Sequence, residues 1–373
     1  METADEPITV SANSKPPPTS QWKVIKATAR GASHERKNLP NQDSIDSTDP
    51  AGDLPIVLAI ADGHGGAKYF RSQEGSRLAV ETALEVIPKF IGKETSGGNQ
   101  GPEVESEVAL DKQTLEFHIP RKLIGDWIGK VLNHVDNNPI AATELAGLDA
   151  KEQHAFIECS NRRSALIQQR AAGTSLSEEN EKDLATSETK LLQAYGATLL
   201  VAALSERNVF YWQLGDGDII SVAPHGEVSQ IMATDDRLFA NETTSLCVSQ
   251  VKDFRVATQP VSDPEKQPAL IMLSTDGYSN SYSSAEGFER VGKDLLLLIA
   301  GENGFEHVSN NLSGWLAETS KNGSGDDITA GILVRMEALK EISSTATNQP
   351  DSPEPLQTSG DATNDSTKQM EKS

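Results

Sequence analysis

Short apolar stretches of strand length recur along this chain, with turn-forming residues between them. The stretches that predict strands are WKVIKATA (22–29), LPIVLAIA (54–61), ATLLVAAL (197–204), NVFYWQL (208–214), IISVAP (219–224), DFRVAT (253–258), ALIMLS (269–274) and ITAGILVRM (328–336). Turn signals such as SERN (205–208) and GDGD (215–218) separate several of them. The pattern predicts hairpin-connected, antiparallel strands.

Helical periodicity is confined to three places in the sequence. One helix is expected over 67–90, a long helical block over about 110–194, and a last pair over about 285–320. In the long block, RKLIGDWIGKVLNHV (121–135) has apolar residues three or four positions apart, as one face of a helix requires. Because strands come in runs and helices are grouped between them, we expect an α+β fold in layers rather than alternating βαβ units.

The composition indicates that only part of the 373-residue chain folds. Hydrophobic residues make up 36% of the chain, and both ends are rich in Pro, Ser and Thr. We expect residues 1–20 and 338–373 to be disordered, because such segments bury too little apolar surface to order themselves. One domain is then expected over 21–337.

The net charge of −22 makes nucleic acid and anionic membranes unfavourable partners. The first residues have neither a basic nor an apolar region of a signal peptide, and the apolar runs are too short to span a bilayer. Cys159 and Cys247 form neither a disulfide framework nor a metal cluster. We therefore expect a soluble cytoplasmic protein.

Three of the apolar stretches end in Asp-Gly, and a fourth begins after two aspartates. The pairs are Asp62-Gly63, Asp216-Gly217 and Asp276-Gly277, and Asp326 and Asp327 precede the last strand. A single Asp-Gly is more often a hairpin turn than a site. If the last strand is antiparallel to its neighbours, however, all four points meet at one end of the sheets. Clustered carboxylates repel one another unless protons or cations intervene, and oxygen ligands suit Mg²⁺ or Mn²⁺.

The order of several short motifs resembles one family. The motifs are NQDS (41–44), IADGHGG (60–66), YGATLLVA (195–202), QLGDGDI (213–219), LSTDGYSN (273–280) and GDDITAGILV (325–334). Over about 24–90 and 194–336 the chain is similar to the metal-dependent serine/threonine protein phosphatases of type 2C (the PPM family), in their bacterial-like form. The resemblance implies a central β-sandwich of two antiparallel sheets flanked by helices, with a metal centre at one end.

The resemblance also implies a role for individual residues. Two or three Mn²⁺ or Mg²⁺ ions are expected, and the substrate is a phosphoserine or phosphothreonine protein attacked directly by metal-bound water. Asp62 would bridge two ions, with Asp276, Asp326 and the Gly63 carbonyl as further ligands and Asp216 at a weaker third ion. Asp43 would orient the water, His64 would be the general acid, and Thr198 would lie at the edge of the site.

Two positions depart from the family pattern. Gln42 stands where most members have Glu, so we expect the second ion to be held more weakly. His34 stands at the position of the arginine that holds the substrate phosphate, and a histidine holds phosphate less firmly. Arg30, Arg36 and Lys37 are alternative phosphate contacts, and each could equally be part of a solvated basic loop.

The long separation of Asp62 from Thr198 predicts a helical insertion at about 91–190. Its histidines, His118, His134 and His154, lack ligand spacing and are interpreted as surface or packing residues. The segment 234–250 resembles a variable flap beside the site that helps to choose the substrate.

Two other functions stay open on the sequence alone. Gln42 and His34 favour a catalytically weak regulatory relative that binds a phosphoprotein or another partner, whereas the intact set of aspartates favours an enzyme. A plain α+β binding module whose Asp-Gly pairs are only turns is the third alternative. The sequence does not predict the oligomeric state.

Overall fold

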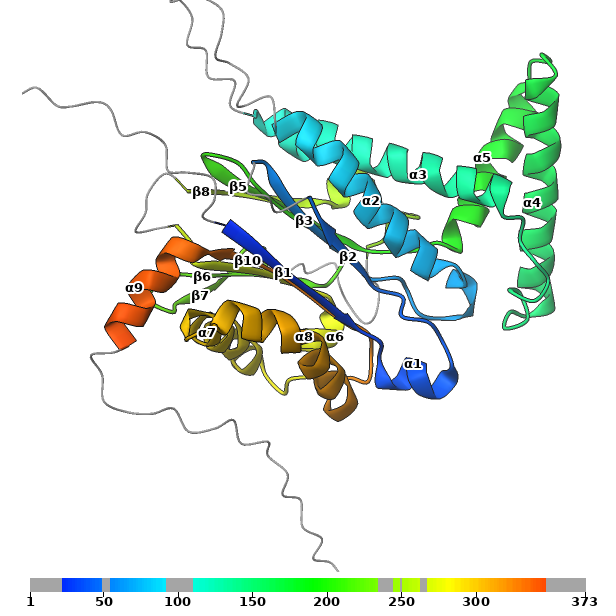
Figure 1. Cartoon of the computed structure of the whole chain (residues 1–373). Coiled ribbons are helices and arrows are strands. Elements are labelled where there is room, and N and C mark those ends of the chain that lie inside the picture. The colour runs from blue at the N-terminus through cyan, green and yellow to red at the C-terminus, as the bar shows by residue number, and fades with distance from the viewer. Residues whose placement is uncertain are drawn as a thin grey trace, which may run out of the picture.

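A computed structural model of the chain describes residues 22–48, 54–91, 110–233, 244–248, 250–261 and 267–346 (Figure 1). The segment 1–20, most of the flap 234–250 and residues 347–373 lie outside the described residues. No described helix has the length and apolar character needed to cross a membrane.

Two five-stranded antiparallel sheets form the centre of the molecule (Figure 1). One sheet has the order β1-β10-β9-β6-β7 and the other β2-β3-β4-β5-β8. The strands are β1 (Trp22–Ala29), β2 (Ser44–Ser47), β3 (Ile56–Ala61), β4 (Leu199–Leu204), β5 (Asn208–Leu214), β6 (Asp218–Val222), β7 (Val228–Gln230), β8 (Arg255–Pro260), β9 (Leu270–Ser274) and β10 (Ile328–Arg335).

Helices cover both outer faces of the sheets. They are α1 (Ala32–Lys37), α2 (Ser72–Ile91), α3 (Ile119–Asn137), α4 (Ala150–Ala171), α5 (Glu178–Gln193), α6 (Asp276–Ser279), α7 (Ala285–Ala300), α8 (Gly304–Asn322) and α9 (Met336–Ala346), with short turns η2 (Ala67–Tyr69), η3 (Thr114–His118) and η4 (Val251–Asp253). α2 and α3 lie on the sheet that contains β3, and α7 and α8 lie on the other sheet (Figure 1). The prediction of a sandwich of two antiparallel sheets flanked by helices is confirmed.

The alternation of side chains in β3 explains the order of the layers. Ile56, Leu58 and Ile60 face the opposite sheet, whereas Val57 and the alanines between them face α2. Since both faces of this strand are covered, it is apolar throughout rather than alternating.

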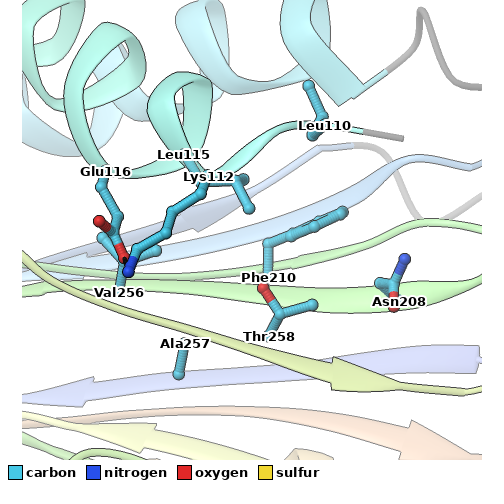
Figure 2. Close-up of a pocket in the computed structure, with 9 residues that line it drawn as sticks. All are labelled: Leu110, Lys112, Leu115, Glu116, Asn208, Phe210, Val256, Ala257 and Thr258. Carbon is cyan, nitrogen blue, oxygen red and sulfur yellow. Dashed lines mark ion pairs between the residues drawn. The ribbon is translucent and has the colours of Figure 1, made fainter. Parts of the chain in front are cut away.

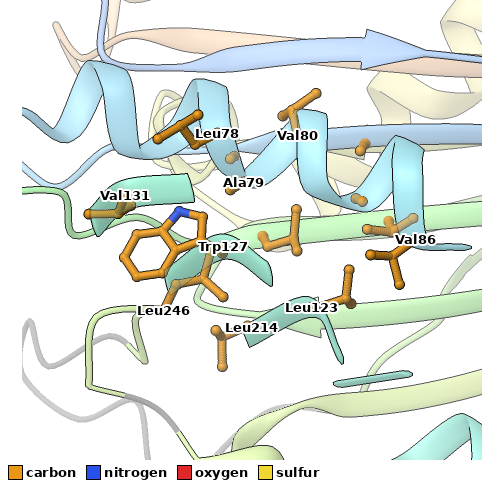
Figure 3. Close-up of a cluster of buried hydrophobic side chains, with 14 of the residues drawn as sticks. Leu78, Ala79, Val80, Val86, Leu123, Trp127, Val131, Leu214 and Leu246 are labelled. Carbon is orange, nitrogen blue, oxygen red and sulfur yellow. The ribbon is translucent and has the colours of Figure 1, made fainter. Parts of the chain in front are cut away.

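The described part of the predicted insertion, residues 110–190, is mostly helical, and only part of it projects from the body. Trp127 of α3 is buried between α2 and the sheet (Figure 3), and its indole N–H donates to the Gly75 carbonyl at 3.0 Å. The indole N–H of Trp212 in β5 donates to the Leu115 carbonyl at 2.9 Å. Truncating a buried tryptophan costs about 3–5 kcal/mol, so α3 belongs to the main core. α4 and α5 form an antiparallel pair that stands out from one end of the sandwich (Figure 1).

The predicted end of the domain at residue 337 is wrong. Residues 338–346, expected in the disordered tail, belong to helix α9, where Ala338 is fully buried and Leu339 nearly so against the cluster that contains α7. The short elements β2, β7 and α1 were also not predicted from the sequence.

Candidate functional site

Antiparallel pairing brings the four acidic strand ends together. β10 begins opposite the end of β9, so Asp326 lies beside Asp276, the first residue of α6. β2 begins opposite the end of β3, which places Asp43 beside Asp62. The Thr275 hydroxyl, from one sheet, donates to Asp43 Oδ2, from the other sheet, at 2.9 Å. Asp62, Asp276 and Asp326, three of the acidic points expected at one end of the sandwich, lie there together with Asp43, and the charge of the fourth, Asp216, acts on Asp276.

Asp62 and Gly63 are held by the backbone of the neighbouring strand. The Asp62 N–H donates to Thr198 Oγ1 at 2.9 Å, and the Thr198 N–H donates to the Asp62 carbonyl at 2.8 Å. A Cβ on Gly63 would lie 2.6 Å from the Gln42 carbonyl oxygen and 2.7 Å from that of Ser72. Only glycine fits at this close approach of three backbone segments.

The aspartates share one crowded and poorly solvated space. Burial, together with the charges of Asp327 and Asp326, raises the pKa of Asp43 to about 8. Burial and next the charge of Asp216 raise the pKa of Asp276 to about 6. Burial and the charges of Asp43 and Asp276 raise the pKa of Asp62 well above its ordinary value. These carboxylates are therefore unfavourable in their charged form unless a cation lies among them.

Asp327 has a different role from its neighbour Asp326. Its Oδ1 accepts from the Gly31 N–H at 2.6 Å, and its Oδ2 accepts from the Gln42 N–H at 2.6 Å and faces His34 Nδ1 at 2.9 Å. The Asp327 side chain is buried, whereas that of Asp326 is 55% exposed. Asp327 fixes the backbone around the site, a role that was not predicted from the sequence, although the residue stands beside Asp326 before the same strand.

His34 lies in α1 beside both of these aspartates. Its Nε2 is 3.7 Å from Asp326 Oδ1. Arg30 donates from Nη2 to the His34 carbonyl at 3.2 Å and lines a hollow of about 390 Å³ between α1 and α8. Arg36 lies near Gly325, and Lys37 ends α1 with an exposed side chain. All four candidate phosphate contacts therefore lie on the α1 side of the aspartates.

The side-chain amide of Gln42 is hydrogen-bonded to two other residues of the protein. Its Nε2 donates to Ser72 Oγ at 2.5 Å and weakly to the His64 carbonyl at 3.5 Å. The amide thus ties the start of α2 to the loop that carries His64.

His64 lies at the edge of the acidic cluster. Its N–H donates to the Gly196 carbonyl at 3.0 Å, and its ring meets the Tyr69 ring edge-on at a centroid distance of 5.0 Å. Burial lowers the pKa of His64 to about 4, while the charge of the exposed Asp216 acts in the opposite direction. Asp216 also acts on Asp276, so it lies within electrostatic reach of both groups. Asp218, two residues further on, is a partly buried carboxyl at this end that was not predicted from the sequence, and burial raises its pKa.

The donor set suits hard divalent cations. Within the described ranges, no three His, Cys, Asp or Glu side chains are already arranged as a metal-binding group. Asp62 and Asp276 instead lie within hydrogen-bond reach of each other, the arrangement expected when a proton offsets the repulsion of two carboxylates. Asp43 Oδ1 is buried without a hydrogen-bond partner among the described residues. Carboxylate and carbonyl oxygens without thiolates fit Mg²⁺ or Mn²⁺.

A separate apolar hollow lies away from these aspartates. It has a volume of about 410 Å³ and lies between η3 and strands β5 and β8 (Figure 2). Phe210, Val256 and Thr258 point into it from the strands, and Leu115 and Lys112 close it from the helical side (Figure 2). None of the candidate site residues lines it.

Comparison with known proteins gives one family match over most of the chain. Residues 30–317 match the family model described as protein phosphatase 2C. No curated protein matches the sequence.

Solved structures of similar architecture include three from different organisms. The serine/threonine phosphatase Stp1 from Staphylococcus aureus is 12% identical, with a TM-score of 0.43 over 88% of this chain and 99% of that one. The serine/threonine phosphatase PstP/Ppp from Mycobacterium tuberculosis is 14% identical, with a TM-score of 0.44 over 84% and 98%. A sex-determining protein of C. elegans is 15% identical, with a TM-score of 0.47 over 86% and 67%.

Proposed function

We propose that this chain, which belongs to the protein phosphatase 2C family, removes phosphate from phosphoserine and phosphothreonine in proteins. One observation supports the proposal more than any other. Aspartates from four strand ends lie together at one end of the sandwich, where burial and mutual repulsion raise the pKa values of Asp43, Asp62 and Asp276, with an imidazole beside them. A purely structural end of a sheet has no need of such an unfavourable arrangement.

Divalent cations are part of the proposal. Asp62, Asp276, Asp326 and the Gly63 carbonyl would hold two Mn²⁺ or Mg²⁺ ions, and Asp216 would contribute to a third. When bound, the ions supply Lewis acidity that activates water and neutralises charge on the phosphate.

The chain's own residues contribute proton transfer and orientation. Asp43, whose Oδ2 is fixed by Thr275, would accept a hydrogen bond from the attacking water through its other oxygen. His64 would donate a proton to the departing serine or threonine oxygen. Its low pKa leaves the ring neutral at pH 7, but a phosphate dianion beside the ring favours the protonated form. The acid would thus form only with substrate in place.

Contact with the substrate phosphate is proposed for the α1 side of the site. His34 is the first candidate there because it faces Asp326, one of the proposed ligands. Arg30, Arg36 and Lys37 are the alternatives. Thr198, hydrogen-bonded to Asp62, would lie at the edge of the site.

The alternative function is a catalytically weak relative that binds a phosphoprotein, and it follows from Gln42 and His34. The experiment is phosphate release from a phosphothreonine peptide and from p-nitrophenyl phosphate, with Mn²⁺ and with excess EDTA. We expect turnover of both substrates only with Mn²⁺. Full activity in EDTA would contradict the metal proposal, and peptide binding without turnover would support the alternative.

A further inference from the structure

Arg71, between η2 and α2, is buried with every N–H of its guanidinium bonded. Its side chain is 8% exposed. Nε donates to Glu144 at 2.7 Å, Nη2 donates to Glu144 at 2.9 Å and to the Pro139 carbonyl at 3.3 Å, and Nη1 donates to the Asn138 carbonyl at 2.9 Å and to the Tyr195 hydroxyl at 2.7 Å. A guanidinium has five N–H groups in a rigid plane, so this set of bonds fixes its position and orientation.

The partners of Arg71 come from two distant parts of the chain. Asn138, Pro139 and Glu144 belong to the connection between α3 and α4, inside the segment 91–190. Tyr195 lies two residues after the last residue of α5 and has no exposed surface. Its hydroxyl also lies 2.8 Å from His134 Nδ1 of α3. Arg71 therefore joins the α3–α4 connection and the chain just after α5 to the start of α2.

The backbone after α5 holds the residues of the proposed site one after another. The Ala194 carbonyl accepts from the Arg71 N–H at 2.9 Å, the Gly196 carbonyl accepts from the His64 N–H at 3.0 Å, and Thr198 is bonded to Asp62 as described. A Cβ on Gly196 would lie 2.7 Å from His64 Cδ2 and 2.8 Å from the Tyr69 ring. The residue next to Tyr195 is thus in direct contact with the imidazole, and a small shift of this backbone moves the ring.

We propose that Arg71, Glu144 and Tyr195 are positioning residues that set the place of the His64 imidazole, and that the α3–α4 connection acts on the site through them. The inference rests on the proposed function, in which His64 is the general acid. It gives the helical segment a part in the leaving-group step.

A merely structural role would have different consequences. Loss of one bond in a buried network lowers stability wherever the network lies. A displaced general acid instead slows the loss of a poor leaving group, such as a peptide threonine, and hardly affects p-nitrophenolate, which leaves well without a proton. The ratio of the two kcat values separates the two roles.

The first test is Tyr195→Phe, with Tyr211→Phe as its matched control. Both tyrosines are fully buried, and both hydroxyls have a bond of 2.7 Å, to Arg71 in one case and to Gln259 in the other. We expect Tyr195→Phe to lower kcat for a phosphothreonine peptide roughly tenfold, a part of the 10²–10⁴ that a general acid supplies. kcat for p-nitrophenyl phosphate and both KM values should stay within about twofold. Tyr211→Phe should leave the kcat ratio unchanged.

The second test approaches the same residues from the helical segment. Glu144→Gln removes the charge that faces Arg71, and Glu152→Gln removes one that faces Lys190 in the same segment, at 2.5 Å. Only Glu144→Gln should change the kcat ratio. An unchanged ratio in both Tyr195→Phe and Glu144→Gln, with lower melting temperatures, would reduce Arg71 to a structural residue and overturn the inference.

A readout without turnover separates this inference from the proposed function. The ring-proton resonances of His64, assigned by their loss in His64→Gln, report the position of the imidazole against Tyr69. We expect them to shift in Tyr195→Phe and not in Tyr211→Phe. If the unmodified protein hydrolyses neither substrate, the proposed function fails, and these resonances alone decide: a shift supports the positioning and no shift contradicts it.

Discussion

Asp43 is buried and Asp62 and Asp276 are partly buried, and the pKa values of all three carboxyl groups lie above the ordinary range. For Asp43 the value is about 8 in the folded protein against 3.8 for the free group. Between pH 6 and 8 the folded protein therefore retains a proton that the unfolded chain has released. Proton uptake on folding means that the free energy of unfolding falls as pH rises through this window.

The metal-free protein should accordingly be more stable at pH 6 than at pH 8. Asp43 contributes about 2 kcal/mol to the difference. His64 has the opposite effect on the free energy of unfolding, but only in part. Burial lowers its pKa from 6.5 to about 4, so the stability that the neutral ring contributes is lost as pH falls between these two values. Thermal melting in EDTA at both pH values measures the difference.

Asp43→Asn should remove most of this pH dependence and raise the melting temperature at pH 8. Asp46→Asn is the control, because Asp46 lies in β2 beside Lys26, whose hydrogen bond and charge keep the pKa of Asp46 below its ordinary value. A pH dependence as large in Asp43→Asn as in the unmodified protein would show that Asp43 is not the titrating group.

Gln42 is the residue at which this chain departs most clearly from a fully charged metal site. Gln42→Glu adds a carboxylate and removes the donor to Ser72. We expect a several-fold lower Mn²⁺ concentration at half-maximal rate, because a further charged oxygen strengthens divalent binding. The same variant should melt at a lower temperature in EDTA, because the added charge lies close to the aspartates.

Gln73→Glu gives the same change of charge at a neighbouring exposed position, and it should leave the Mn²⁺ requirement unchanged. A requirement that is unaltered in Gln42→Glu would mean that position 42 contributes no ligand.

At the scale of elements, α9 changes where the domain ends. Truncation after residue 346 should leave the melting temperature and the rate on p-nitrophenyl phosphate unchanged. Truncation after residue 335 exposes the surface that Ala338 and Leu339 cover and should cost about 2–4 kcal/mol. Equal melting temperatures for the two truncations would mean that α9 does not pack on the domain.

Elements with a strong apolar period were predictable, and short polar ones were not. Each apolar stretch from 22–29 to 328–336 contains a strand close to its predicted bounds. β2 and β7 are three or four residues long and mostly polar, so pairing with a neighbour rather than their own sequence makes them strands. α9 was not predicted because the serines and threonines near 343–346 make its sequence similar to the polar tail that follows.

The candidate site was predictable in outline for a physical reason. Asp-Gly after an apolar strand marks the strand end, and antiparallel pairing brings such ends together. Asp327 and Arg71 could not be found in this way, because their roles depend on partners nearly 300 and over 60 residues distant. Sequence spacing says nothing of such contacts until the fold is known.

At the scale of the whole molecule, negative charge shapes how substrate approaches. The chain carries a net charge of −22, and the site itself is a cluster of acids. A phosphopeptide is repelled from such a surface until cations reverse the local potential. In the proposed function, metal must therefore bind before substrate.

The most direct measurement is the rate of phosphate release from a phosphothreonine peptide as a function of Mn²⁺ concentration, in the unmodified protein, Asp62→Asn and Asp46→Asn. We predict saturable activation by Mn²⁺ in the unmodified protein and in Asp46→Asn. In Asp62→Asn turnover should be lost at every Mn²⁺ concentration while thermal melting shows an intact fold. Substantial Mn²⁺-dependent turnover by Asp62→Asn would contradict the claim that the aspartates at the end of the sandwich are the catalytic metal site.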